Sequence, residues 1–200
     1  MRSARALIAP AVDVVVDSAL WKGQRGVDAM LRRAIAEAAA LASEASGQRG
    51  NSYKVRAPDT RPEPGSSAHA AMASTSDGEL AIVLTDDSAI RALNRDWRGK
   101  DEPTNVLSFP AKEARTGDDA PRMLGDIVIA YETAAREAEI EGKPLMHHVA
   151  HLAVHGFLHL VGYDHEASEA ADAMERLEVA ILARLGVPDP YPLRDASARS

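Results

Sequence analysis

The segment from Leu145 to His165 constrains this chain more than any other, because it combines an apolar helical pattern with regularly spaced histidines. Six of the chain's seven histidines fall within it, beginning at His147. Residues four positions apart lie on the same face of a helix, so His155 and His159 are expected to stack one above the other. Two imidazoles in this arrangement are able to hold one metal ion at about 2.0–2.1 Å from each nitrogen.

Gly162 follows this helix and is expected to end it and reverse the chain, which would return His165 toward the same ion. Three protein ligands leave a fourth position open, as catalytic zinc sites do, whereas structural zinc sites are closed. The chain contains no cysteine, so any zinc site has to use His, Asp or Glu. We therefore predict one zinc ion per chain, held by His155, His159 and His165.

His151 is the competing third ligand, since it lies one helical turn before His155. Successive steps of four residues drift by about 40° around a helix. His151, His155 and His159 are therefore not expected to converge on one ion, and a ligand from the following turn suits the site better. We expect His147, His148 and His151 to have structural or supporting roles. Without a metal, all of these would be ordinary surface or core histidines.

The remaining periodicity predicts an α+β fold in a single domain over residues 1–200: a small mixed sheet of about four strands against several helices, with the metal site on the C-terminal histidine-rich helix and the following turn. The expected strands are Val12–Asp17, Leu80–Leu84, Asn105–Pro110 and Asp126–Ala130. The expected helices are Val27–Ala45 with Gly47 as its stop, a helix capped within 85–87 that runs through Trp97, Tyr131–Glu141, Leu145–Val161 and Ser168–Leu185.

Residues 48–78 differ in composition, being rich in Ser, Pro, Gly, Thr and Arg, and we expect a flexible insert there rather than a domain boundary. No apolar run approaches the length of a transmembrane helix. The absence of cysteine fits a reducing compartment, so a cytoplasmic location is expected. The net charge of −7 argues against indiscriminate nucleic-acid binding but leaves room for a local basic patch.

Such a patch is formed by Arg91, Arg95, Arg98 and Lys100. We expect Arg98, which precedes Gly99, to lie in a loop between a helix and a strand. Its guanidinium is able to bind a phosphate through two parallel hydrogen bonds and to stabilise transition-state charge. An ordinary cation at a helix end, favoured by the helix dipole, fits the sequence about equally well.

The residues around this patch also allow two interpretations each. Asn105 and Ser108 either hydrogen-bond a sugar or phosphate or hold their own loop in place. Trp97 and Phe109 either stack on bases or pack in the core, and core packing is favoured. Asp164 either orients a ligand histidine or acts as a base.

Four segments resemble the YbeY family of bacterial rRNA-maturation endoribonucleases, over roughly residues 80–191. The two long ones are His155-Gly-Phe-Leu-His159-Leu-Val-Gly162-Tyr-Asp164-His165 and Trp97-Arg98-Gly99-Lys100-Asp101-Glu102-Pro103-Thr104-Asn105-Val106-Leu107-Ser108-Phe109-Pro110. The two short ones are Leu124-Gly125-Asp126-Ile127 and Asp189-Pro190-Tyr191.

The resemblance implies a single-strand-specific metallo-endoribonuclease acting in 16S rRNA 3′-end maturation and 70S ribosome quality control. It implies one zinc ion on the three histidines and a functional arginine at Arg98. With it we assign Arg98 as catalytic and Lys100, Asn105 and Ser108 as substrate-binding. Single-stranded rRNA precursor is the implied substrate, with small-subunit ribosomal proteins and a ribosome-associated GTPase as partners.

Two other functions fit the same residues. One is a zinc-dependent peptidase or amidase, although Gly156 stands where zinc peptidases carry a glutamate base directly after the first histidine. The other is a ribosome-assembly binding module with a structural metal. Cleavage of single-stranded RNA that depends on the metal separates these from the endoribonuclease.

Overall fold

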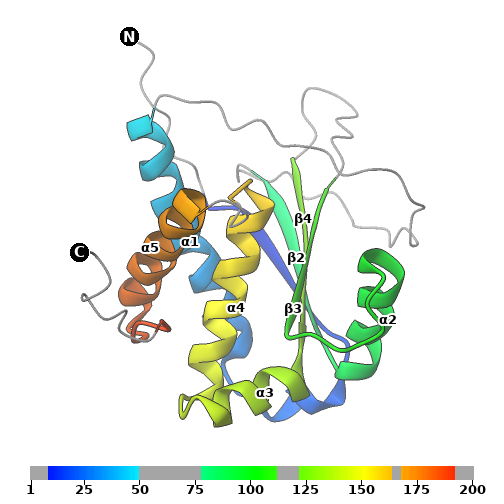
Figure 1. The fold of residues 1–200 in the computed structure, drawn as a ribbon. Helices are drawn as coiled ribbons and strands as arrows, with labels where there is room; N and C mark the ends of the chain where they lie inside the picture. The colour runs from blue at the N-terminus through cyan, green and yellow to red at the C-terminus, as the bar shows by residue number, and fades with distance from the viewer. Residues whose placement is uncertain (1–8, 50–77, 112–121, 164–167, 192–200) are drawn as a thin grey trace.

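The computed structural model describes residues 9–49, 78–111, 122–163 and 168–191. Four strands form one mixed sheet in the order β1-β2-β4-β3 (Figure 1). β2 pairs in parallel with β1 and with β4, and β3 pairs antiparallel with β4 at one edge. The strands are β1 (Ala11–Val16), β2 (Glu79–Thr85), β3 (Val106–Pro110) and β4 (Met123–Ala130). The helices are a 3₁₀ helix (Ala19–Gly23), α1 (Val27–Arg49), α2 (Asp87–Arg98), α3 (Tyr131–Ile140), α4 (Leu145–Leu160) and α5 (Ser168–Leu185). The predicted α+β class is confirmed.

The two faces of the sheet are covered by different helices. In Figure 1, α1, α4 and α5 lie to one side of the strands and α2 lies to the other. Successive side chains of a strand point to opposite faces, so Ile127 packs in the larger core against α4 while Val128 packs in a smaller cluster with Ile90 of α2. Neighbouring residues of one strand therefore pack into hydrophobic clusters on opposite faces of the sheet.

α4 is apolar nearly all round because it packs against the sheet, α1 and α5 at once. Val154, Phe157 and Leu158 are among its buried residues. A helix enclosed in this way has only a narrow exposed stripe. His155 and His159 are among the residues of α4 that are only partly buried.

Two local expectations were wrong. α1 does not stop at Gly47 but runs to Arg49; a glycine costs a helix interior only about 1 kcal/mol, which the preceding alanine-rich turns tolerate. Residues 48 and 49 thus end α1, and the flexible insert expected at 48–78 stays a prediction. Gly78 precedes β2, and its carbonyl accepts a 2.8 Å hydrogen bond from the Ala11 N–H of β1. Residues 50–77 lie outside the described part. Arg98 closes α2 rather than lying in a loop.

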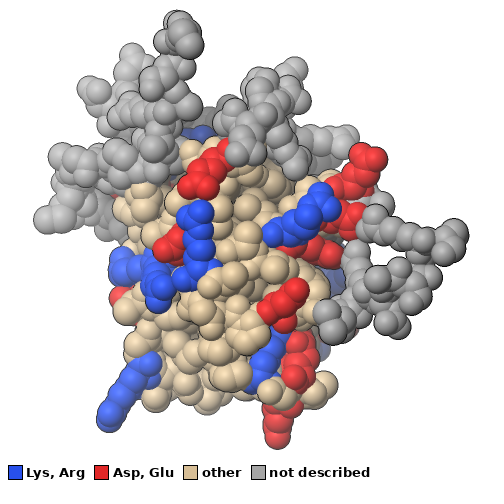
Figure 2. Space-filling view, turned by 90° about the vertical axis from the view of Figure 1, so that its left-hand side faces the viewer, with Lys and Arg blue, Asp and Glu red and all other residues tan. Residues whose placement is uncertain are grey.

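The surface over α1 and α5 carries both signs of charge, interspersed on a largely uncharged surface (Figure 2). Arg184 of α5 lies 3.7 Å from Glu37 and 3.4 Å from Glu44, both on α1. Among the described residues, this face has no predominance of cations of the kind that phosphate binding requires. None of the helices in the described segments is long and apolar enough to cross a membrane.

Candidate active site

The side chains of His155 and His159 meet on the exposed stripe of α4. Their Nε2 atoms lie 3.1 Å apart and the ring centroids 4.6 Å apart. Two nitrogens that each bind one tetrahedral ion at about 2.0–2.1 Å would be about 3.3–3.4 Å apart. The fold therefore brings this pair to nearly the spacing that a single shared ion requires.

The partners of the other ring nitrogens decide which atoms face the ion. His159 Nδ1 lies 3.0 Å from the backbone carbonyl oxygen of Tyr163. A carbonyl oxygen only accepts, so His159 Nδ1 carries the proton. His155 Nδ1 lies 2.7 Å from the Oε1 atom of Glu178 and donates in the same way. In the neutral rings both Nε2 atoms then carry a lone pair, and two such nitrogens 3.1 Å apart are suited to bind a cation.

A Schellman turn at the end of α4 places the Tyr163 carbonyl. The Tyr163 N–H donates to the Leu158 carbonyl over 2.9 Å, and the Gly162 N–H donates to the His159 carbonyl over 3.0 Å. Gly162 has φ 92°, a left-handed conformation that glycine adopts without strain. The predicted chain reversal is thus present. His165 and Asp164 lie outside the described residues, so the third ligand stays a prediction, and the segments that are described hold no group of three metal-ligating side chains.

Glu178 of α5 contacts His155 from the buried side of the site. Its side chain is fully buried, and the Tyr191 hydroxyl donates to its second carboxylate oxygen, Oε2. Burial alone would raise the pKa of this carboxyl, but contacts with His151, His155 and Tyr191 outweigh burial and lower the pKa to about 2. The carboxylate is therefore charged at neutral pH and fixes the tautomer of His155.

Sequence reasoning missed Glu178, although a signal was present. It lies four residues after Met174 and three before Ile181, two fully buried positions of α5. A glutamate on the apolar face of a helix is almost never buried without a partner. That position could have been recognised as the partner of a cation or a histidine.

The other histidines of α4 have different surroundings. His148 is buried, and its Nε2 lies 2.7 Å from the Oε2 atom of Glu137 on α3. Burial lowers the pKa of His148 more than Glu137 raises it. The Nε2 of His151 lies 3.6 Å from Glu178, beyond hydrogen-bond distance, and its ring nitrogens have no hydrogen-bond partner within the described segments. The ring centroid of His151 lies 6.4 Å from that of His155, whereas the centroid of His159 lies 4.6 Å from it.

Gly156 faces the sheet rather than the site opening. A Cβ atom there would lie 2.9 Å from Ile127 Cγ2 and 3.0 Å from Ser108 Oγ. The absence of a side chain lets α4 approach β3 and β4 closely, which places Ser108 beside the turn of α4 that carries His155. A glutamate side chain at position 156, as in zinc peptidases, does not fit between these layers.

β3 packs against α4 and forms one edge of the sheet. Hydrogen bonds from Ala130 N–H to the Asn105 carbonyl and from Ala111 N–H to the Leu124 carbonyl fix which residues of β3 bond to β4. By the antiparallel alternation, the N–H and C=O of Ser108 point outward from the sheet. Ser108 therefore offers both its backbone and its side chain at this edge.

Asn105, by contrast, is used by the fold. Its Nδ2 donates to Glu137 over 2.9 Å, and its Oδ1 accepts from the Val106 N–H over 2.7 Å. Glu137 also bonds His148, so Asn105 ties the start of β3 to α3 and α4. Of the two interpretations left by the sequence, these contacts favour the one in which Asn105 holds its own loop. Its role in substrate binding stays a prediction.

The predicted basic patch lies at the C-terminal end of α2, on the opposite side of the sheet from α4. Two of its cations are paired: Arg91 binds Asp101 through two 2.9 Å contacts, and Arg95 lies 2.8 Å from Asp96. Arg98 and Lys100 are exposed and form no ion pair within the described residues. The patch is therefore reduced to two available cations, which are the two assigned to the substrate.

Comparison with known proteins decides the family. A model of the family described as "Endoribonuclease YbeY" matches residues 65–186. The chain belongs to the YbeY family. Proteins named "Endoribonuclease YbeY" from two Rhodopseudomonas palustris strains are 50% and 49% identical over 190 residues; both alignments span 94% of this chain, and they span 94% and 96% of the relatives. One from Nitrobacter hamburgensis is 49% identical over 94% of this chain and 86% of its own. A solution structure of TM1509 from Thermotoga maritima covers 92% of this chain and 98% of its own at 17% identity and a TM-score of 0.45, too distant to bear on the site.

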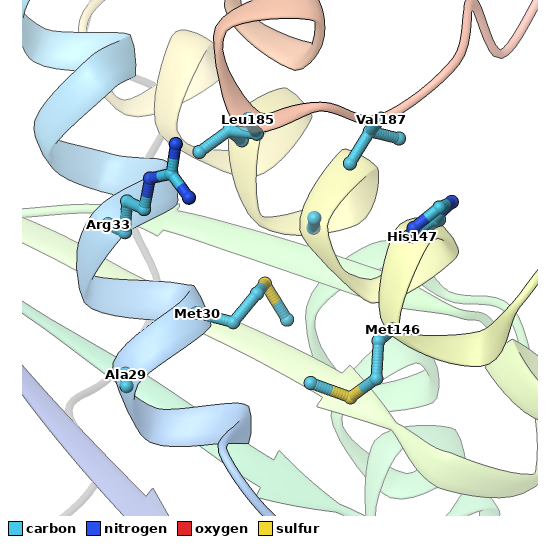
Figure 3. Close-up of a pocket in the computed structure, with 8 residues that line it drawn as sticks. Ala29, Met30, Arg33, Met146, His147, Leu185 and Val187 are labelled. Atoms are coloured by element: carbon cyan, nitrogen blue, oxygen red, sulfur yellow. The ribbon is translucent and has the colours of Figure 1, made fainter.

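A separate apolar pocket of about 370 Å³ lies between α1, α4 and the end of α5 (Figure 3). Met30 and Met146 line its floor, with His147, Leu185 and Val187 around it. Arg33 also lines it, and its guanidinium donates to the Arg184 carbonyl over 3.0 Å, which caps the end of α5. This pocket contains neither His155 nor His159, so we do not place the chemistry of this YbeY-family chain there.

Proposed function

We propose that this YbeY-family chain is a single-strand-specific, zinc-dependent endoribonuclease that acts on rRNA precursor in 16S rRNA 3′-end maturation and 70S ribosome quality control. The observation that carries the proposal is the pair of Nε2 lone pairs on His155 and His159, 3.1 Å apart and fixed by protonated Nδ1 atoms. The names of its relatives supply the substrate class.

Zinc on His155, His159 and His165 would supply a Lewis acid for phosphodiester cleavage. The chain's own residues prepare the site. Glu178 holds the proton of His155 at Nδ1, and the Tyr163 carbonyl holds that of His159, so neither ring needs to rotate when the ion binds. Arg98 supplies a guanidinium for the charge that develops on the phosphate.

Two further points belong to the proposal. The chain would act in the cytoplasm, with small-subunit ribosomal proteins and a ribosome-associated GTPase as partners. The peptidase alternative loses support from the packing of Gly156, because the layers of α4, β3 and β4 exclude the side chain of a base there. The alternative of a binding module with a structural metal needs the experiment below.

The test combines metal analysis with an assay on single-stranded RNA. We expect zinc near one ion per chain, cleavage that a chelator abolishes, and recovery when zinc is restored. Alanine at His155, His159 or His165 should remove both zinc and cleavage, whereas His151→Ala should retain zinc. Zinc at full occupancy in His165→Ala would overturn the ligand assignment. Bound zinc without cleavage would favour the binding module.

A further inference from the structure

Trp97 exposes 42% of its surface at the end of α2, although it is the kind of side chain that cores normally bury. The chain's other tryptophan, Trp21, is 1% exposed and its indole N–H donates to the Thr85 carbonyl over 2.7 Å. The ring of Trp97 packs edge-on against Phe109 of β3, with centroids 5.6 Å apart and planes at 62°. This contact holds the indole in place and leaves much of it open to solvent.

Two cations, Arg98 and Lys100, follow Trp97 closely in the sequence. Arg98 and Lys100 form no ion pair within the described residues, whereas the nearby acids Asp96 and Asp101 are occupied by Arg95 and Arg91. Glu102 is the remaining acid of this loop and is exposed. Two available cations adjacent to an exposed aromatic ring combine the two elements of single-strand nucleic-acid sites, which are phosphate contact and base stacking.

The end of α2, which carries Trp97 and Arg98, and the loop after it, which carries Lys100, are held together by the fold. Asn94 is buried, and its Nδ2 donates to the Glu102 carbonyl over 2.8 Å. The paired contacts between Arg91 and Asp101 fasten the same loop to α2 from its exposed side. Groups already fixed in position lose less conformational freedom when a ligand binds.

Edge strand β3 connects this loop with the histidine pair. Phe109 points to the α2 face, where it contacts Trp97, while its neighbour Ser108 points to the α4 face, beside Gly156. Since β3 is the last strand of the sheet, a flexible chain can pass over its edge from one face to the other. A folded duplex could not follow so sharp a path.

We propose that Trp97 is a stacking platform for one base of a single-stranded RNA, and that Lys100 holds a phosphate next to that base. The choice of RNA rests on the proposed function. Every base has an aromatic face, so the platform should accept any of the four. The RNA would cross the edge of β3 between this platform and His155.

The two tryptophans make the test direct, because only Trp97 is able to contact a ligand. The full chain with its bound metal is titrated with a single-stranded 2′-O-methyl RNA of about ten nucleotides, whose integrity is checked on a gel. We expect quenching of tryptophan emission that survives in Trp21→Phe and is lost in Trp97→Phe. An abasic strand of equal charge should bind more weakly and should not quench.

Affinity gives the second measurement. Trp97→Leu should weaken binding roughly 5- to 150-fold, the range for loss of one stacked base, and Trp97→Phe should weaken it less. Lys100→Ala should reduce the salt dependence of binding by about one ion while the quenching remains. Ile140→Ala, which shortens a side chain 79% exposed on α3, is the matched control and should bind as the parent does.

The outcomes separate this proposal from the proposed function. Quenching and stacking without RNA cleavage would support the platform and count against the endoribonuclease. Cleavage with parent-like binding in Trp97→Leu, and no quenching, would overturn the platform alone. Melting temperature is measured for each variant, and if Trp97→Leu unfolds, Trp97→Phe and the abasic strand decide the question.

Discussion

The Nδ1 atom of His155 lies 2.7 Å from the Oε1 atom of Glu178, across the interface between α4 and α5. The two residues are separated by 23 positions in the sequence, and only the packing of the helices brings them together. A fully buried carboxylate next to a half-buried imidazole orients that ring before any ion arrives.

This contact predicts that Glu178→Gln lowers zinc affinity by about 10- to 100-fold, as loss of a carboxylate bonded to a ligand histidine typically does. An amide can still accept a hydrogen bond but supplies no charge to hold the His155 proton. Competition with a chromophoric chelator measures the change. Glu169→Gln, an exposed position on the same helix, serves as the control. Unchanged zinc affinity in Glu178→Gln would leave the carboxylate with a packing role only.

Gly156→Ala should destabilise the fold, because the new methyl group meets Ile127 and Ser108 at 2.9 and 3.0 Å. Overpacking of this kind costs about 1–3 kcal/mol, which corresponds to a fall of several degrees in melting temperature. Gly23→Ala is the matched control, since nothing lies within 4 Å of a Cβ placed there. Thermal unfolding of the two variants would show equal stabilities if α4 had room to shift away from the sheet.

Arg98→Ala should leave stability and zinc content unchanged, since the side chain is exposed and makes no ion pair among the described residues. If Arg98 stabilises transition-state charge, RNA cleavage should fall by about a hundred- to a thousand-fold. Arg98→Lys should restore only part of the rate, because an ammonium cannot form the bidentate fork. Arg95→Ala removes a neighbouring cation already paired with Asp96 and should have little effect. Parent-like cleavage by Arg98→Ala would refute the catalytic assignment.

Asn105→Ala and Ser108→Ala should differ in their effects on stability and on RNA binding. Asn105→Ala breaks the contacts with Glu137 and the Val106 N–H, so it should cost about 1–3 kcal/mol of unfolding free energy. Ser108→Ala should change stability little and weaken RNA binding. Chemical denaturation and RNA titration of both variants test this. If Asn105→Ala is as stable as the parent chain, the interpretation of Asn105 as a substrate-binding residue is favoured.

His148 predicts a loss of stability in mild acid. Its folded pKa is lowered, chiefly by burial, so the unfolded chain takes up this proton more readily than the folded one. The stability it allows is present above the ordinary histidine pKa of about 6.5 and declines as pH falls through that value toward the lowered folded pKa. His148→Gln should flatten this decline, measured in the presence of chelator so that metal release does not contribute. His147→Gln should show the same decline as the parent chain.

The sequence predicted the elements well because each has a local signal. Asp86 is the N-cap of α2, where its side chain accepts from the Ala89 N–H over 3.0 Å, and α5 has the bounds that its periodicity predicted. The strand order was not predictable, since nothing local in β2 states that β4 lies beside it. The ends of helices were predicted less reliably, because Gly162 ends a helix while Gly47 does not. Tertiary context decides between them.

The site residues also divide into those with a local sequence signal and those that only the fold brings together. The spacing of His155 and His159 is a property of one helix and could be predicted from the sequence. The contacts of Glu178 and Tyr191 with the site join separate segments and needed the fold. The contacts of Asn105 with Glu137 and with the Val106 N–H also needed the fold, and its substrate role stays a prediction. Whether His165 completes the ligand set awaits the metal analysis.

The backbone groups on the edge of β3 affect whether molecules of this chain aggregate at high concentration. A sheet edge with unpaired N–H groups invites the strand of another molecule and so leads to aggregation. On β3 the outward positions are Val106, Ser108 and Pro110; proline has no N–H, and Asn105 already occupies the N–H of Val106. One outward donor, on Ser108, remains along the strand. The edge is therefore a poor template for a neighbouring strand, and it stays open to ligands that do not need a continuous ladder of hydrogen bonds.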